Sequence, residues 1–197
     1  MSQLQRKLEQ LYPLINQCQK KTRCYPHSKN TVPGIHIEGK DKPVLLLAEA
    51  PGKNEDEEGV PLVGKAGEVL QKLLINIEWT SGFFITNIMK CRPPDNRDPL
   101  EGEQELCGRW LLKQIEIVQP RGVLCLGKTS SQFVLRLAGH DPERWQRGLQ
   151  FMYNSMPVLC TWHPAACLYA GGGHRKEQLK EDLILAKFIL SKEYPFL

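Results

Sequence analysis

Short, mostly apolar runs recur along the chain, and stretches with helical spacing separate them. Four such runs, at 44–48, 83–86, 122–126 and 156–161, are bounded by polar residues, prolines or glycines. Continuous apolar runs of this length are typical of strands that are buried on both faces of a parallel sheet. Since helical segments alternate with them, the pattern predicts a three-layer α/β/α fold around a central, mainly parallel, four-stranded sheet.

The helical segments are predicted from apolar residues that repeat at helical spacing. The first, at the N-terminus, includes Cys18, and Pro13 is expected to kink or end it. Asp98 is the expected N-cap of another helix, with Pro99 at its first position and Glu101 completing a capping box. The remaining helices are expected over 64–77, from 127 onward and over 175–191, and a polar loop over 22–42.

Four loops leave the carboxyl ends of the predicted strands, at 49–64, 87–99, 127–130 and 162–173. The carboxyl ends of parallel strands meet at one edge of a sheet, where α/β proteins bind their ligands. Three of the loops are rich in glycine and proline, which lets main-chain amides approach a ligand closely. We therefore expect the four loops to form one cleft.

Composition and charge narrow the class of protein. The 197 residues suit a single domain over 1–197, and 41% apolar residues suffice for a core. A net charge of +4 is compatible with nucleic-acid binding without requiring it. No apolar run approaches the roughly 18 residues of a membrane span, and the N-terminus lacks the apolar centre of a signal peptide. We therefore predict a cytoplasmic monomer that binds no membrane.

Seven cysteines in a cytoplasmic protein indicate metal ligands or buried thiols rather than disulfides. Cys125 and Cys160 lie within predicted strands and Cys167 lies in an apolar loop, so we expect these three to be structural. Cys91, in contrast, belongs to the segment TNIMKCRPPDNRDP at 86–99, which also carries amide and cationic side chains. A stiff basic loop with an amide and a thiol indicates a nucleic-acid site beside a metal site.

Five motifs in order resemble the iron–sulfur uracil-DNA glycosylases, known as families 4 and 5, and they cover about residues 18–190. The first is AEAPG at 48–52 with GVPLVGKAG at 59–67, and the second is TNIMKCRPPDNRDP, which is closer to family 4. Cys107 matches the spacing of a cluster thiolate after Cys91, Leu126-Gly127 resembles the strand-to-helix turn, and HPA at 163–165 resembles the last motif. The resemblance implies a DNA glycosylase with the uracil-DNA glycosylase-like fold.

The resemblance also implies a 4Fe–4S cluster held by four thiolates, namely those of Cys18, Cys24, Cys91 and Cys107. Thiolates bind iron–sulfur clusters and zinc alike, and zinc is the less favoured alternative. The N-terminal pair departs from the family, because it is spaced C-x5-C where the family usually shows C-x2-C. Either Cys18 reaches the site from a longer turn or the cluster is altered. The cluster is expected to tie the N-terminal helix and loop, about 1–42, to the domain.

Excision of a base builds positive charge on the deoxyribose and negative charge on the departing base, once the nucleotide has left the stack. His163 is expected to donate a hydrogen bond to the base carbonyl, and Asn87 to pair with the Watson–Crick edge of a pyrimidine. Their alternatives are structural, a capped histidine and a turn-forming asparagine. Glu49 is the candidate for polarising water or stabilising the sugar cation, with Glu55 and Asp56 as alternatives. The other predicted substrate-binding residues are Ala48, Ala50, Pro51, Gly52 and Leu62.

Phosphate contacts are expected from cationic side chains of the second and third loops and from main-chain amides at a helix N-terminus. After His163, the apolar run 165–169 is expected to insert beside the vacated base, or else to pack on the domain. The predicted DNA-binding residues are Lys90, Arg92, Arg97, Gly127, Lys128, Ser130, Pro164 and Leu168.

Leu62 stands where the family normally has a phenylalanine that stacks on the flipped uracil. A leucine offers less planar contact, and stacking on an aromatic ring contributes about 1–3 kcal/mol per base. The default interpretation is a monofunctional glycosylase that hydrolyses uracil from DNA and leaves an abasic site. A pocket for a bulkier modified pyrimidine, as in hypermodified phage DNA, is the second interpretation. A non-catalytic module that senses damaged DNA is the alternative of another class.

Overall fold

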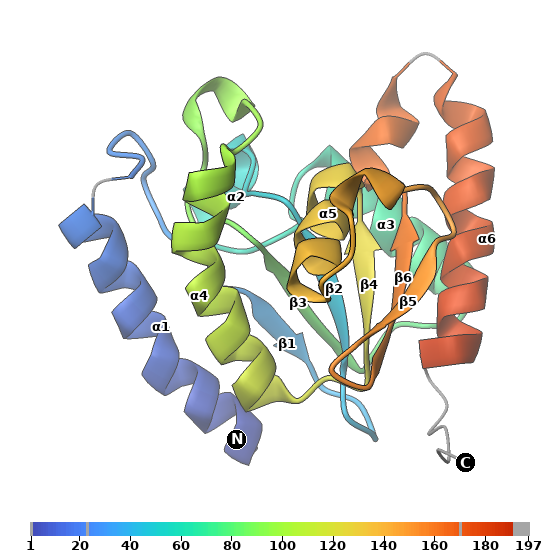
Figure 1. The fold of residues 1–197 in the computed structure, drawn as a ribbon, viewed down its shortest axis with the longest axis horizontal. Helices are drawn as coiled ribbons and strands as arrows, with labels where there is room; N and C mark the ends of the chain where they lie inside the picture. Colours follow the sequence, from blue (N-terminus) through green and yellow to red (C-terminus); the bar gives the residue numbers. More distant parts are fainter. Residues whose placement is uncertain (1, 23, 170, 191–197) are drawn as a thin grey trace.

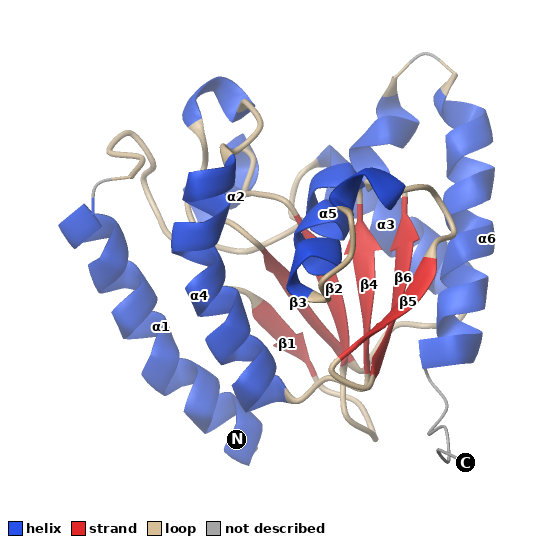
Figure 2. Ribbon diagram, in the orientation of Figure 1, coloured by secondary structure: helices blue, strands red, loops and turns tan. Residues whose placement is uncertain are grey.

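The computed structural model describes residues 2–22, 24–169 and 171–190. A six-stranded sheet in the order β1-β3-β2-β4-β6-β5 forms its centre (Figures 1 and 2). Its four parallel strands are β2 (Val44–Ala48), β3 (Phe83–Asn87), β4 (Gly122–Leu126) and β6 (Met156–Thr161). These are the strands predicted from the apolar runs, and Asn87 extends the second of them by one residue.

Two antiparallel strands at the edges of the sheet are not predicted by the pattern of apolar runs. β1 (Ile35–Ile37) pairs with β3, and β5 (Gln150–Tyr153) pairs with β6. The prediction of a four-stranded sheet is therefore incomplete. β1 is three residues long within the loop expected over 22–42, and most of β5 is not buried, so neither strand carries a continuous apolar run.

Helices cover both faces of the sheet and confirm the three layers (Figure 2). Alternate side chains of a strand point to opposite faces. Leu45 and Leu47 of β2 therefore pack toward α4 and α5, whereas Leu46 packs toward α3 and α6. None of the described helices is both long and apolar enough to cross a lipid bilayer. The four helices that cover the sheet are α3 (Lys65–Asn76), α4 (Glu101–Val118), α5 (Lys128–Leu137) and α6 (Gly172–Leu190).

The N-terminal helix α1 (Gln3–Thr22) lies beside α4 (Figure 1) and continues through Pro13 instead of ending there. Leu11 and Ile15, on either side of the proline, pack against Trp110 of α4. This packing offsets the hydrogen bond that a proline removes from a helix. The contact brings the end of α1, where Cys18 lies, to the same side of the domain as Cys107 of α4.

Two helix starts differ from the prediction. α4 begins at Glu101 with Leu100 as its N-cap, so the expected N-cap Asp98 is wrong. The reason is that Glu103 Oε2 accepts the hydrogen bond from the Leu100 main-chain N–H at 2.7 Å. α6 begins at Gly172 rather than near 175, and its predicted last residue, 191, lies outside the described residues. A further short helix, α2 (Lys53–Glu58), forms within the loop that follows β2.

Candidate active site

A cleft of about 320 Å³ opens where β2, β3 and β6 end. This volume lies in the range of about 300–1,000 Å³ that is typical of small-ligand sites. Ala48 is only 2% exposed and does not line the cleft, so its prediction as a substrate-binding residue is wrong. The other predicted substrate-binding residues all line the cleft, namely Glu49, Ala50, Pro51, Gly52, Leu62, Asn87 and His163.

The loop after β4 packs beside the cleft without lining it. Gly127 has a φ of 100°, and a Cβ there would stand 3.0 Å from Cβ of His163. Glycine therefore lets this turn pack against the histidine. Thr129, two residues further, hydrogen-bonds the carboxylate of Glu49. The expectation that all four loops line one cleft is corrected: three line it, and the third loop in sequence supports two of the residues that do.

His163 follows β6 and precedes a short 3-10 turn, η3 (Pro164–Leu168). The main-chain N–H of Ala165 donates a hydrogen bond to Nδ1 of His163, at 3.2 Å. Nδ1 is therefore an acceptor, and the neutral ring carries its hydrogen on Nε2. Burial lowers the pKa of His163 to about 4, so that the ring is neutral near pH 7. The cleft thus contains a neutral imidazole with one N–H to donate.

Glu49 supplies a carboxylate to the same cleft. Burial raises the pKa of Glu49, the charge of Asp98 adds to the rise, and the hydrogen bond from Thr129 opposes it. A carboxylate whose pKa is raised accepts a proton from water more readily than an exposed one. This environment suits a residue that orients and polarises a water molecule.

Glu55, one alternative to Glu49, holds the first loop closed. Its Oε2 accepts from the main-chain N–H of Gly52 at 3.1 Å, and its Oε1 accepts from that of Gly64 at 2.9 Å. The carboxylate thereby joins the two ends of the loop that lines the cleft. Both oxygens already accept hydrogen bonds from main-chain amides, so they are less available than those of Glu49 to orient a water molecule.

Asp56, the other alternative, binds the loop that follows α1. It is 3% exposed and does not line the cleft. Its carboxylate accepts from Ser28 Oγ at 2.6 Å and from the main-chain N–H groups of Lys29 and Asn30. The expectation that Asp56 polarises water is therefore wrong, because its oxygens anchor residues 28–30.

Leu62 forms a wall between the cleft and an apolar cavity of about 510 Å³. Its main chain is left-handed, with a φ of 56°. A Cβ at Gly67 would stand 1.7 Å from the main-chain oxygen of Leu62, so only glycine fits at position 67, in the first turn of α3. The GKAG sequence thus fixes the position of Leu62 at the edge of the cleft.

Lys90 is buried and cannot contact a DNA phosphate. It is 1% exposed, and Nζ donates to Oγ1 of Thr86 at 2.8 Å, to Oε1 of Gln114 at 2.7 Å and to the main-chain oxygen of Asn87 at 2.5 Å. Burial lowers the pKa of Lys90 to about 7, and the nearby Cys107 and Cys91 oppose this fall. The prediction of Lys90 as a DNA-binding residue is wrong.

The other predicted DNA-binding residues divide by exposure. Ser130 is 0% exposed with Oγ hydrogen-bonded to the Gly127 oxygen, and Pro164 is also buried, so these two side chains cannot reach DNA. Arg97 is exposed at the cleft, where both oxygens of Glu103 hold its guanidinium at 2.9 and 2.7 Å. Lys128 and Leu168 are exposed, and Gly127 and Arg92 are partly exposed.

Some residues that line the cleft were missed. They are Ala66, Pro93, Asn96 and Ala165. Each lies inside a segment that carries the family resemblance, so the motifs themselves contained the signal. Three of the four, Ala66, Pro93 and Ala165, have small or cyclic side chains without polar groups, and the fourth, Asn96, lies in the segment from which Asn87 is the predicted amide.

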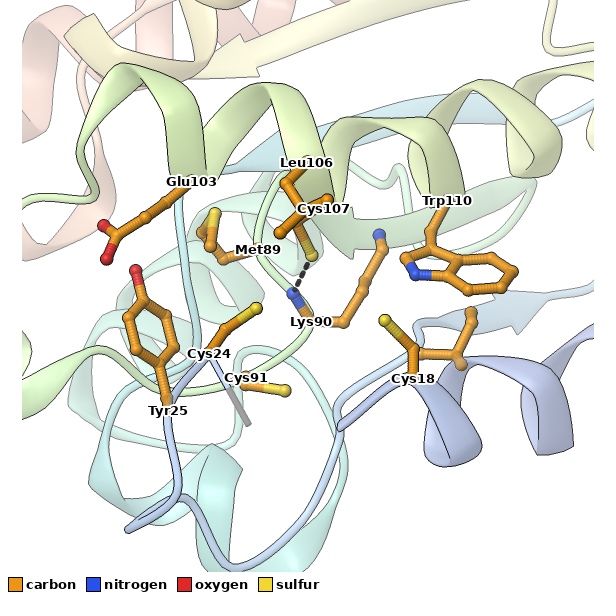
Figure 3. Close-up of a pocket in the computed structure, with 11 residues that line it drawn as sticks. Cys18, Cys24, Tyr25, Met89, Lys90, Cys91, Glu103, Leu106, Cys107 and Trp110 are labelled. Atoms are coloured by element: carbon orange, nitrogen blue, oxygen red, sulfur yellow. Dashed lines mark hydrogen bonds between the residues drawn. The ribbon is translucent and has the colours of Figure 1, made fainter. Parts of the chain in front are cut away.

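The four predicted metal ligands line one cavity, to which α1, the following loop, the loop after β3 and α4 each contribute (Figure 3). Cys107 Sγ accepts a hydrogen bond from the main-chain N–H of Lys90 at 3.2 Å, and Cys18 Sγ accepts one from Arg109 at 3.3 Å. Proximity of the other thiols contributes, after burial, to raising the pKa of Cys91 to about 12. The C-x5-C spacing therefore does not keep Cys18 and Cys24 from the other pair.

The cavity is also lined by Trp110, whose indole N–H has no hydrogen-bond partner among the described residues. No three metal-binding side chains of the described part of the chain gather around a single ion position, and the four thiols instead surround the cavity. Four thiols and an unpartnered N–H donor fit a thiolate-bound cluster. Cys125 and Cys160 are buried in the sheet, as predicted.

Comparison with known proteins agrees with this geometry. The model of the uracil DNA glycosylase superfamily matches residues 36–186. The chain is 40% identical to a type-4 uracil-DNA glycosylase of Pyrobaculum aerophilum, over 82% of this chain and 84% of that protein. It is 38% identical to one of Saccharolobus solfataricus, over 91% and 84%, and 33% identical to one of Archaeoglobus fulgidus, over 89% and 88%.

Proposed function

The chain belongs to the uracil-DNA glycosylase superfamily, and we propose that it is a DNA glycosylase that hydrolyses uracil from DNA. The names of its relatives favour uracil over a bulkier modified pyrimidine and favour an enzyme over a damage-sensing module. The observation that carries the proposal is a neutral His163 in the same cleft as Asn87 and Glu49.

The base enters the cleft after its nucleotide leaves the DNA stack. The carboxamide of Asn87 offers a donor and an acceptor side by side, which match the carbonyl and the N–H on the Watson–Crick edge of uracil. As the glycosidic bond lengthens, negative charge develops on the base carbonyls, and Nε2–H of His163 stabilises it. Because the imidazole is already neutral near pH 7, it stabilises this charge as a hydrogen-bond donor and keeps its Nε2 proton.

Water then attacks the deoxyribose carbon. Glu49 orients the water through its carboxylate and stabilises the positive charge that builds on the sugar. The products are free uracil and an abasic site. No lysine lines the cleft among the described residues, so the reaction proceeds through water rather than through a Schiff base.

A 4Fe–4S cluster is the group that the cysteine cavity would hold, with Cys18, Cys24, Cys91 and Cys107 as its ligands. The cluster would join α1 and the loop after it to the rest of the single domain. Its contribution would be structural, since the cavity and the cleft are lined by different residues. The thiol set alone also suits zinc.

Substrate DNA lies over the mouth of the cleft. The exposure of Arg97 at the cleft and of Lys128 supports a role of these two cationic side chains in binding phosphates. Leu168, 47% exposed, is the apolar side chain that would fill the vacated base position. A reducing cytoplasm would keep the cysteines available as ligands.

Uracil release from a labelled oligonucleotide with a single uracil tests the function. Alkali-sensitive strand breakage at the uracil is expected for the wild-type protein and not for the His163→Ala protein. Breakage only at a bulkier pyrimidine would show that this base, and not uracil, is the substrate. DNA binding that is unaffected by His163→Ala, without release of any base from the wild type, would favour the non-catalytic module.

A further inference from the structure

We propose that Lys90 is a positioning residue for substrate recognition, which aims the carboxamide of Asn87 by holding its main chain and joins it to the cysteine cavity. This inference rests on the proposed function, because it assigns Asn87 to the recognition of uracil. Lys90 itself does not line the cleft. It acts through Asn87, three residues before it in the same segment.

The surroundings of Lys90 Nζ match an ammonium group. Three oxygens accept from it, those of Thr86, Gln114 and the Asn87 main chain, at 2.5–2.8 Å. The Thr86 hydroxyl gives its own hydrogen to the Pro33 oxygen at 2.8 Å, so it faces Nζ as an acceptor. An ammonium group has three hydrogens to donate and no acceptor. The number of oxygens therefore equals the number of donors.

The Asn87 carboxamide depends on this support. Asn87 is 3% exposed and lines the cleft, and no hydrogen bond joins its side chain to another described residue. Its direction is therefore set by its main chain, whose oxygen is held by Nζ of Lys90. The adjacent N–H of Ile88 donates to the Ala48 oxygen at 3.0 Å and fixes the other side of this turn.

The same residue contacts the cysteine cavity through its main chain. The N–H of Lys90 donates to Sγ of Cys107 in α4 (Figure 3). The side-chain Nζ of Lys90 reaches Gln114, further along α4. Cys91 follows Lys90 directly in the sequence. Lys90 therefore links the two ends of the segment 87–91, because its side chain holds Asn87 and its main chain adjoins Cys91.

Lys90→Met separates the two contacts, because it removes the ammonium group but keeps the main-chain N–H on Cys107. The inhibition constant of free uracil is the readout, since it reports on recognition without DNA binding or bond cleavage. We expect this constant to rise about 10- to 100-fold, the scale of a misplaced recognition group. Iron content and visible absorbance should stay at the wild-type level. Thr86→Val, which removes one of the three acceptors, should raise the constant less and serves where the methionine variant does not fold.

Lys187→Met is the matched control. Lys187 Nζ also binds main-chain oxygens, those of Ile77 and Glu78 at 2.8 and 3.0 Å, but it does so away from the cleft. It should lower thermal stability and leave the uracil inhibition constant unchanged. Unchanged uracil inhibition in the Lys90 and Thr86 variants, an equal rise in the Lys187 variant, or a rise that follows loss of iron would each overturn the inference. A wild-type protein that neither releases nor binds uracil would instead refute the proposed function.

Discussion

Ala165 fixes the tautomer of His163 through a hydrogen bond from its main-chain N–H to Nδ1, at 3.2 Å. The nitrogen left for the substrate is therefore Nε2, and burial keeps the ring neutral by lowering its pKa to about 4. We predict that His163 stays in the neutral Nε2–H form from about pH 8 to about pH 5, whereas an unperturbed histidine titrates in this range. Nitrogen-15 NMR of labelled histidine measures both tautomer and charge, and titration near pH 6.5 would contradict the prediction.

The same pKa shift predicts a stability change. The pKa of His163 is lower in the folded chain than the 6.5 of an ordinary histidine, so the unfolded chain binds more protons below that pH. The part of the folding free energy that depends on the neutral His163 is fully present above about pH 6.5 and is lost as the pH falls toward about 4. Urea unfolding near pH 7 and near pH 5 should show a larger acid loss for the wild type than for His163→Gln. Equal losses in both proteins would show that the histidine is not responsible.

Glu49→Gln should lower the rate of uracil release in a single turnover by about 10²- to 10⁴-fold, because an amide cannot accept a proton. Free uracil should bind the variant as well as it binds the wild type. The wild-type rate should fall as the pH decreases through the raised pKa of Glu49, and the variant should lack this limb. Glu58→Gln, an exposed change in the same loop, is the control and should behave like the wild type. Equal rates for both variants would exclude Glu49 from the chemistry.

Much of the fold could be predicted because its four central strands are continuous apolar runs. The edge strands β1 and β5 could not, since each has one neighbour and side chains that are partly exposed, which leaves no apolar run to detect. The start of α4 was misplaced for a different reason. The sequence predicts Asp98 as the N-cap and Glu101 as the residue that completes the capping box, and only the fold shows that Glu103 reaches the Leu100 amide instead.

The candidate site was predictable where side chains follow strands, as Glu49, Asn87 and His163 do. It was not predictable where burial depends on tertiary packing. Lys90 shares a basic loop with Arg92 and Arg97, so its charge indicates DNA, yet oxygens from β3 and α4 enclose it. Asp56 likewise has a neighbour, Glu55, that does line the cleft. Adjacent residues with the same charge face different surroundings, and only the three-dimensional fold distinguishes them.

Leu62→Phe tests whether this side chain contacts the base. The left-handed main chain at position 62, with φ 56°, puts a similar constraint on both residues, so the substitution changes mainly the side chain. We expect uracil to bind more tightly, by up to about 1–3 kcal/mol, because an aromatic ring stacks on the base. Inhibition by free uracil measures this gain. Unchanged inhibition would place the side chain on the apolar cavity rather than against the base.

Asp56→Ala should destabilise the fold by about 3 kcal/mol, because several buried donors from residues 28–30 lose a charged acceptor. The folded fraction should keep its rate of uracil release, since Asp56 does not line the cleft. Urea unfolding and single-turnover rates measure the two quantities. Glu57→Ala is the control, since it removes only an exposed ion pair with Lys29 and should cost less than about 1 kcal/mol. A loss of the single-turnover rate in the folded fraction would show that Asp56 takes part in the reaction.

Trp110→Phe keeps an aromatic ring beside the cysteine cavity and removes the indole N–H, which has no partner among the described residues. If that N–H donates to cluster sulfur, its removal should make the reduction potential more negative, because hydrogen bonds to sulfur stabilise the reduced, more negative state. Protein-film voltammetry of the iron-loaded protein measures the potential, and the rate of iron release to a chelator should rise with the same substitution. Trp145→Phe is the matched control, since Trp145 also has a buried indole N–H without a partner but does not line the cavity. A potential and a release rate equal to those of the control would show that the indole N–H does not face the cluster.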